Sequence, residues 1–166
     1  MKKKLYIETS VWNQLEHDDR PEWRQTAKKF MDALRNGIYE PYISDIVIRE
    51  IEATPSITLQ KKLVQHINNI NPVVIPASEE VELLTEKYLS GGFGKNESLR
   101  IYNDCSHVAM ATVTEIRHIV SFNCKHLVND HRIDVFNAIN FQNGYDLMID
   151  ITMPHKFVMD EEKETK

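Results

Sequence analysis

The chain has 166 residues, of which 42% are hydrophobic and 27% are charged, and this balance predicts one globular domain with its own core. No run of about 20 apolar residues is present, which argues against a membrane-spanning helix. The net charge of -5 argues against a protein that coats nucleic acid non-specifically, because such proteins are usually basic. It leaves open a nuclease with an acidic metal site and a local basic patch, for which the candidates are Lys95, Arg100, Lys125, His126, His131 and Arg132.

Three lysines follow Met1, as at the start of a signal peptide, but the apolar segment that should follow is interrupted by Glu8, Asn13 and Glu16. We therefore expect a cytoplasmic protein. Cys105 and Cys124 are 19 positions apart and form no C-x-x-C pair, so the sequence indicates neither a disulfide scaffold nor a zinc knuckle. Two reduced, mostly buried thiols are expected.

A buried strand is predicted at Leu5 to Ile7, and it runs directly into an acid, Glu8. Thr9 and Ser10 follow, and these residue types commonly open a helix. In open α/β sheets, ligands bind outside the carboxyl ends of the strands, so Glu8 stands where chemistry is usually done. The alternative is that Glu8 is a helix-start acid that interacts with the positive end of the helix dipole.

The remaining elements follow from apolar spacing, capping residues and β-branched runs. Helices are predicted over residues 21–35, 45–54, 56–70, 78–90 and 99–115, and strands over 39–43, 73–75 and 118–122. A short helix after Asn123, a second helix around 133–138 and a final strand within 147–151 complete the pattern. The alternation predicts a single α/β domain over 1–158, with three α/β/α layers and a central parallel sheet of about five strands covered on both faces. The polar tail, 159–166, is expected to be frayed.

On the helix predicted over 45–54, Glu50 lies beside the apolar stripe of Val47 and Ile51. A charge there needs a partner, because an unpaired buried carboxylate is costly. The alternative is that Glu50 lies at the edge of the stripe and points to water or pairs with an Arg or Lys.

On the helix predicted over 99–115, Asp104 and His107 are three residues apart beside the apolar stripe, so both can project from one edge. His107 is either a donor to a carboxylate or a phosphate, or a satisfied structural residue. Asn123 follows a strand, as Glu8 does. Carboxylate and amide oxygens at one end of a sheet suit Mg²⁺ or Mn²⁺, whereas the thiols and histidines lack the spacing of zinc ligands.

Four blocks of sequence, in this order, resemble the acidic-motif blocks of PIN-domain proteins, and the closest likeness is to the VapC-like ribonuclease toxins of type II toxin-antitoxin systems. The blocks run from Tyr6 to Val11, from Ile43 to Ile51, from Asp104 to Ala111 and from Ser121 to Leu127. The resemblance implies a PIN-like fold and a ribonuclease that depends on Mg²⁺ or Mn²⁺. Such an enzyme hydrolyses RNA with a metal-activated water and needs no covalent intermediate.

Carried over by position, the resemblance implies a metal site formed by Glu8, Glu50 and Asp104, with Asn123 as a fourth catalytic residue where many members have Asp. The substrate contacts that it implies are Thr9, Ser10, His107 and Lys125. The chain departs from the family pattern twice, because Glu8 stands where Asp is commoner and because Asn123 removes a negative charge.

The leading hypothesis is therefore a toxin with RNA as its substrate and a small antitoxin protein as its partner, with homodimer formation left open. The alternative is a PIN-like RNA-binding or regulatory module that has lost efficient catalysis. It is motivated by Asn123 and by the acidic net charge. Other doubly wound enzymes are disfavoured, because the first strand is followed by Glu8, Thr9 and Ser10 rather than by a D-x-D or a G-x-G-x-x-G motif.

Overall fold

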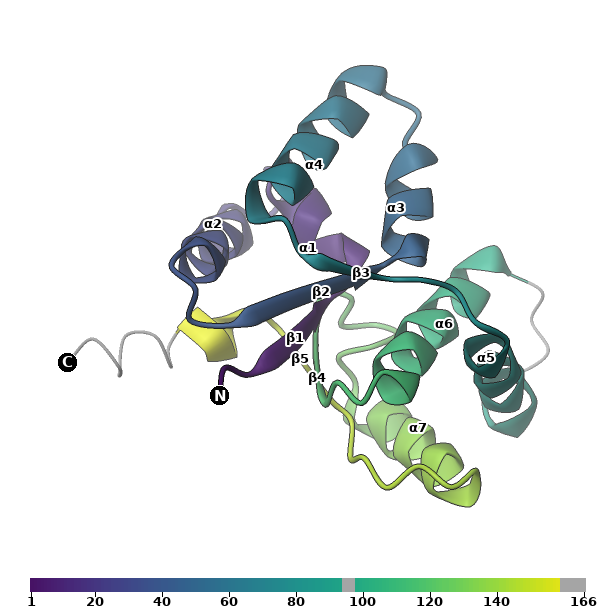
Figure 1. Cartoon of the computed structure of the whole chain (residues 1–166). Coiled ribbons are helices and arrows are strands. Elements are labelled where there is room, and N and C mark those ends of the chain that lie inside the picture. Colours follow the sequence, from purple (N-terminus) through teal and green to yellow (C-terminus); the bar gives the residue numbers. More distant parts are fainter. Residues whose placement is uncertain (94–97, 159–166) are drawn as a thin grey trace.

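The structure is a computed structural model that describes residues 1–93 and 98–158. These residues form a three-layer α/β/α arrangement around a five-stranded parallel sheet with the order β3-β2-β1-β4-β5 (Figure 1). The fold class predicted from the sequence is thereby confirmed. The predicted frayed tail, 159–166, lies outside the described residues. The strands are β1 (Lys4–Ile7), β2 (Glu40–Ser44), β3 (Val73–Ile75), β4 (His118–Val120) and β5 (Asp150–Thr152).

Helices cover the sheet on both faces (Figure 1). One apolar cluster packs the first face against α1 (Thr9–Gln14), α2 (Pro21–Arg35) and α4 (Ile57–Ile70). A second cluster packs the other face against α5 (Glu79–Gly91), α6 (Leu99–Val113) and α7 (Asp130–Gln142). Helix α3 (Asp45–Glu52) contributes Val47 and Ile51 to the first cluster and Ile46 to the second. None of the described helices is long and apolar enough to cross a membrane.

Strand β1 is central because its apolar residues serve both faces of the sheet. Leu5 and Ile7 belong to the first cluster and Tyr6 to the second, and all three are fully buried. This accounts for the continuous apolar run of the strand, since strands buried on both faces do not alternate with polar residues.

The strand order places a topological switch point between β1 and β4. The chain runs outward from β1 through β2 to β3, and then returns to β4 on the other side of β1. Ile7 is paired with Val120, and the Glu8 amide donates to the Val120 carbonyl at 3.0 Å. The residues that follow β1 and β4 therefore emerge side by side, which is where open α/β sheets bind ligands.

The predicted short helix after Asn123 is wrong, because residues 124–127 form turns instead. The Asn123 carbonyl accepts from the amides of Leu127 and Val128, both at 2.9 Å. Helix α7 then begins earlier and ends later than predicted. Strand β5 begins only at Asp150, and Asn137 holds the residue before it, since its side chain accepts from the Ile149 amide and donates to the Ile149 carbonyl.

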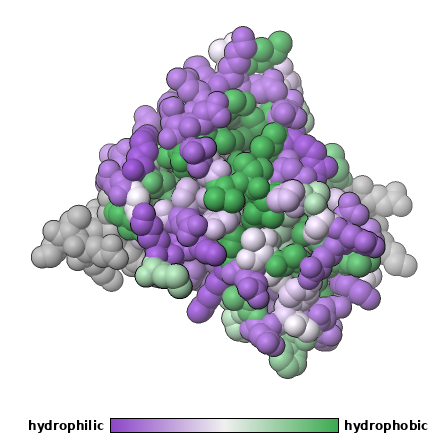
Figure 2. Space-filling model, viewed as in Figure 1, coloured by the Kyte–Doolittle hydropathy of each residue, from purple (hydrophilic) through white to green (hydrophobic). Residues whose placement is uncertain are grey.

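Two expectations about burial also need correction. Cys105 is buried, but Cys124 is exposed, because it lies in the turn after Asn123. Strand β3 is an edge strand, and Val73 and Val74 are about half exposed (50% and 45%). The sheet is therefore not fully covered at this edge, where Figure 2 shows apolar surface.

Candidate active site at the switch point

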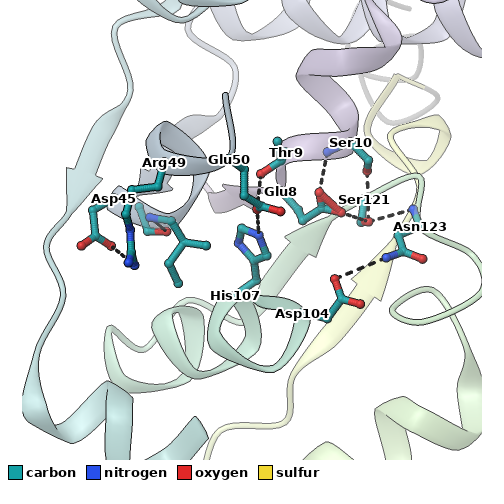
Figure 3. A network of polar contacts seen from close by, with 12 residues as sticks. Glu8, Thr9, Ser10, Asp45, Arg49, Glu50, Asp104, His107, Ser121 and Asn123 are labelled. Atoms are coloured by element: carbon teal, nitrogen blue, oxygen red, sulfur yellow. Dashed lines mark hydrogen bonds and ion pairs between the residues drawn. The ribbon is translucent and has the colours of Figure 1, made fainter. Parts of the chain in front are cut away.

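A cavity of about 600 Å³ opens at the carboxyl ends of β1 and β4. Glu8, Glu50, Asp104 and Asn123 all line it, although they come from the end of β1, from α3, from α6 and from the segment after β4 (Figure 3). The structure therefore brings together the four residues that the sequence predicted.

Glu8 is buried and its carboxylate is held from two sides. One oxygen accepts from the Ser10 amide as the N-cap of α1, and the other accepts from the Ser121 hydroxyl at 2.7 Å. The Ser121 hydroxyl in turn accepts from the backbone amide of Asn123 at 2.9 Å. Glu8 therefore caps the start of a helix and also lines the cavity.

Glu50 lines the cavity, and its partners are Thr9 and His107 rather than water or an Arg or Lys, as the alternative had it. Its Oε1 accepts from the Thr9 hydroxyl at 2.8 Å and lies 2.5 Å from His107 Nε2. Burial alone raises the pKa of Glu50, but the hydrogen bond and charge of His107 and the Thr9 hydroxyl outweigh it, so the pKa lies below its usual value. The neighbouring Arg49 pairs with Asp45 rather than with Glu50 (Figure 3).

His107 lies behind Glu50 and is only 1% exposed. Its Nδ1 is 2.6 Å from the Tyr6 hydroxyl, which lies 2.8 Å from Ser44 Oγ. Burial alone lowers the pKa of His107, but the hydrogen bond and charge of Glu50 outweigh this and raise it. This geometry favours His107 as a donor to a carboxylate. The burial of the ring leaves no direct phosphate contact.

Asp104 is the least satisfied carboxylate of the cavity. It is 9% exposed, Oδ1 is 3.5 Å from the Asn123 side-chain nitrogen, and Oδ2 is buried without a hydrogen-bond partner among the described residues. Burial, followed by the negative charge of Glu8, raises its pKa to about 7. An ionised Asp104 would therefore gain from a cation in the cavity.

Asn123 makes two contacts within the protein through its side chain. Its carbonyl Oδ1 accepts from the His126 amide at 3.0 Å and closes the turn, while its NH₂ group faces Asp104. The NH₂ group of Asn123 therefore offers a weak hydrogen-bond donor to the Asp104 carboxylate, whereas an Asp at position 123 would repel Asp104.

Three residues predicted to contact substrate line the cavity, namely Thr9, Ser10 and Lys125. They differ in whether the side chain is already hydrogen-bonded within the protein. The Thr9 hydroxyl donates to Glu50, and the Ser10 hydroxyl accepts from the Phe122 amide at 2.8 Å. These two side chains therefore hold the site together. Lys125 and the neighbouring cavity residue Arg100 are exposed, which leaves both free to meet a phosphate.

The donor set suits a hard cation, but the described part of the chain holds no preformed metal cluster. Among residues 1–93 and 98–158, no group of three His, Cys, Asp or Glu side chains lies close enough to hold a metal ion as it stands. However, Mg²⁺ usually keeps several waters and takes only one or two protein carboxylates together with substrate phosphate. Oxygen ligands line the cavity, and Asp104 Oδ2 has no partner, so the chemistry of the site fits such an ion.

The sequence did not reveal several residues that shape this site. Ser121, Tyr6 and Ser44 position the acids or His107, and Arg20 and Trp23 line the cavity. Ser121 directly follows β4, two residues before Asn123, and this position at a strand end was the one feature of the sequence that could have indicated its role. Of the proposed basic patch, Arg132 lies over Phe93 with its guanidinium carbon 5.3 Å from the ring centroid, and Lys95 lies outside the described residues.

No family model and no curated protein matches the sequence. Among solved structures, the chain is similar to FitAcB from Neisseria gonorrhoeae, with a TM-score of 0.55 and 11% identity over 91% of this chain and 98% of that chain. It is also similar to VapBC2 from Rickettsia felis, which was solved bound to a DNA fragment from their promoter, with a TM-score of 0.53 and 15% identity over 89% of this chain and 98% of that chain. At these identities the similarity shows a shared fold.

Proposed function

We propose that this chain, which has the PIN-like fold, is a Mg²⁺-dependent endoribonuclease and the toxin of a toxin-antitoxin pair. The observation that carries the proposal is the cavity at the switch point, which Glu8, Glu50 and Asp104 line from three different elements. His107 and Thr9 hold Glu50, whereas Asp104 Oδ2 has no partner among the described residues, and the burial of this acid beside Glu8 is costly unless a cation compensates its charge. The pKa of Asp104 is raised to about 7 because burial and the charge of Glu8 disfavour its ionised form.

When bound, Mg²⁺ supplies a Lewis acid that lowers the pKa of a water and stabilises the charge that develops on the scissile phosphate. The protein contributes acids that are already oriented. Ser121 and the Ser10 amide hold Glu8, while Thr9 and His107 hold Glu50. Asp104 would help to hold the cation as an ionised carboxylate, so its raised pKa of about 7 would make cation binding compete with protonation below about pH 7.

The assignment as a toxin with an antitoxin partner is supported by the two similar structures, whose names join two components, and by the four sequence blocks. RNA is proposed as the substrate because of the resemblance to ribonuclease toxins. The exposed Arg100 and Lys125 on the cavity can contact its phosphates.

Cleavage by the purified protein tests this function. We expect single-stranded or structured RNA to be cut in the presence of Mg²⁺ or Mn²⁺ and to remain intact in EDTA. DNA of the same sequence is the matched substrate control. Intact RNA under all metal conditions, from a protein shown to be folded, would contradict the enzymatic assignment.

A second candidate function is a PIN-like module that binds RNA or regulates without efficient catalysis. It is favoured by Asn123 in place of an acid and by the absence of a preformed three-ligand cluster among the described residues. Such a module would retain RNA in a filter-binding assay, in metal and in EDTA alike, without cutting it.

A further inference from the structure

A stack of three side chains forms one wall of the cavity. The Trp23 and Phe122 rings are nearly parallel, with an interplanar angle of 21° and centroids 5.0 Å apart. The Arg20 guanidinium carbon lies 4.1 Å from the centroid of the Trp23 ring. All three residues line the cavity that also contains Glu8 and Asp104.

The backbone fixes Arg20 at this position. Its carbonyl accepts from the Trp23 and Arg24 amides at 3.0 and 3.1 Å at the start of α2, and Pro21 takes the first position of the helix. Gln14, the last residue of α1, donates to two residues of the loop before α2, the Asp19 carboxylate at 3.2 Å and the His17 carbonyl at 3.3 Å. The start of α2 therefore fixes the Arg20 backbone three residues before Trp23, from where its side chain lies over the indole.

The charge of Arg20 is not neutralised within the described part of the chain. Arg24, close by, pairs with Asp18, but no described carboxylate lies within ion-pair distance of Arg20. An exposed guanidinium that lies over an indole ring and lines a cavity presents both a cation and a planar group. RNA-binding proteins use these features to stack unpaired bases.

We propose that the stack of Arg20, Trp23 and Phe122 is a subsite for one unpaired nucleobase of RNA next to the scissile phosphate, and this inference rests on the proposed ribonuclease function. Phe122 stacks against the Trp23 ring and the exposed Arg20 guanidinium lies over the same ring system, so the base stacks on the exposed guanidinium. The subsite selects single-stranded RNA, because bases within a duplex are already stacked.

Binding of abasic oligonucleotides tests the subsite. A short single-stranded RNA of mixed sequence, and a series in which each position in turn lacks its base, are titrated in EDTA so that no cleavage occurs. For the wild-type protein, we expect one abasic position to weaken binding about tenfold, the usual scale of one base stacked on a protein side chain. Arg20→Ala should weaken binding of the intact RNA by a similar factor and show no further loss at that position.

Two variants separate stacking from simple charge. Arg20→Lys keeps the charge but loses the planar group, so it should behave like Arg20→Ala. Lys125→Ala, on the same cavity, should weaken binding of every oligonucleotide and keep the abasic penalty. Arg20 is exposed, so its replacement tests the subsite without opening the core, whereas Trp23→Leu also removes packing.

An abasic penalty that persists in Arg20→Ala, or wild-type binding by Arg20→Lys, would overturn the subsite. If the wild-type protein cleaves RNA in Mg²⁺ and this coupling is absent, the subsite alone is wrong. If the folded protein neither binds nor cleaves any RNA, the proposed function fails together with it.

Discussion

Asp104 is the acid of the cavity whose ionised form is most disfavoured by its surroundings. Its pKa of about 7 lies above the ordinary value of 3.8 because of burial first and the charge of Glu8 second. An acid whose pKa is raised by folding binds its proton more tightly in the folded state than in the unfolded state. Its ionisation therefore costs no stability below the unfolded pKa, an increasing amount between the two pKa values, and the full amount above about 7.

Asp104→Asn should accordingly stabilise the metal-free protein at about pH 8 by on the order of 2 kcal/mol and flatten its loss of stability between about pH 4 and pH 7. Urea unfolding in EDTA across this pH range measures both effects. Asp134→Asn, an exposed acid on α7, is the matched control and should change little. Equal pH profiles for the wild type and Asp104→Asn would show that Asp104 is not a strained acid.

Asn123→Asp should tighten Mn²⁺ binding in the absence of RNA by about tenfold, the scale of a charged over a neutral ligand. The substituted side chain can still accept from the His126 amide with one oxygen, while its second oxygen replaces the NH₂ group that faces Asp104. Isothermal titration of both proteins with Mn²⁺ measures the change. Unchanged or weaker binding would place Asn123 outside the metal shell.

The residues of the site were predictable to the extent that each acid stood at a strand end or beside an apolar stripe. Glu8, Glu50 and Asp104 met these criteria. Ser121 and Arg20 did not stand out, because a serine near a strand end and an arginine before a proline become informative only through contacts distant in sequence, with Glu8 and with the cavity. His107 was ambiguous because only tertiary packing places its ring between Tyr6 and Glu50.

At the scale of the elements, Tyr6 connects parts of the fold that lie far apart in the sequence. It projects from β1, and its hydroxyl contacts His107 on α6 and Ser44 at the end of β2. Through His107 the same contacts reach Glu50 on α3. Burial raises the pKa of Tyr6 well above its usual value, so the hydroxyl stays protonated and the network stays neutral at this point.

Tyr6→Phe should therefore destabilise the protein by roughly 1 to 3 kcal/mol, because it leaves buried polar groups on His107 and Ser44 without their partner. Urea unfolding measures the loss. Tyr145→Phe removes a hydroxyl that bonds to Glu80 at the surface and should cost much less. A similar effect of both substitutions would mean that the Tyr6 network does not support the site.

Local signals determined which elements could be predicted. Helix α2 matches its predicted range because Pro21 starts it and Gly37, with a φ of 74°, lies just beyond its end. The short helix after Asn123 failed because side-chain and carbonyl bonds of Asn123 close turns there. The start of β5 depends on Asn137, twelve residues before Ile149, and no local pattern reveals such a contact.

At the scale of the molecule, the strand order gives the site its location. Because the chain reverses its course across the sheet between β1 and β4, two strand ends open onto one cavity, to which α3 and α6 add their acids. The apolar sequence pattern predicted the layers. It did not predict the strand order, which depends on which edges of the sheet pair.

The central claim is that Glu8, Glu50 and Asp104 form a metal-dependent ribonuclease centre, and single-turnover cleavage of RNA in Mg²⁺ by the wild type and by Asp104→Asn tests it most directly. This substitution removes one charge at nearly constant volume. We expect the cleavage rate to fall at least about a hundredfold, since each 1.36 kcal/mol of lost transition-state stabilisation is worth a factor of ten, while the variant remains folded. A folded Asp104→Asn protein that cuts RNA at the wild-type rate would contradict the assignment of the site.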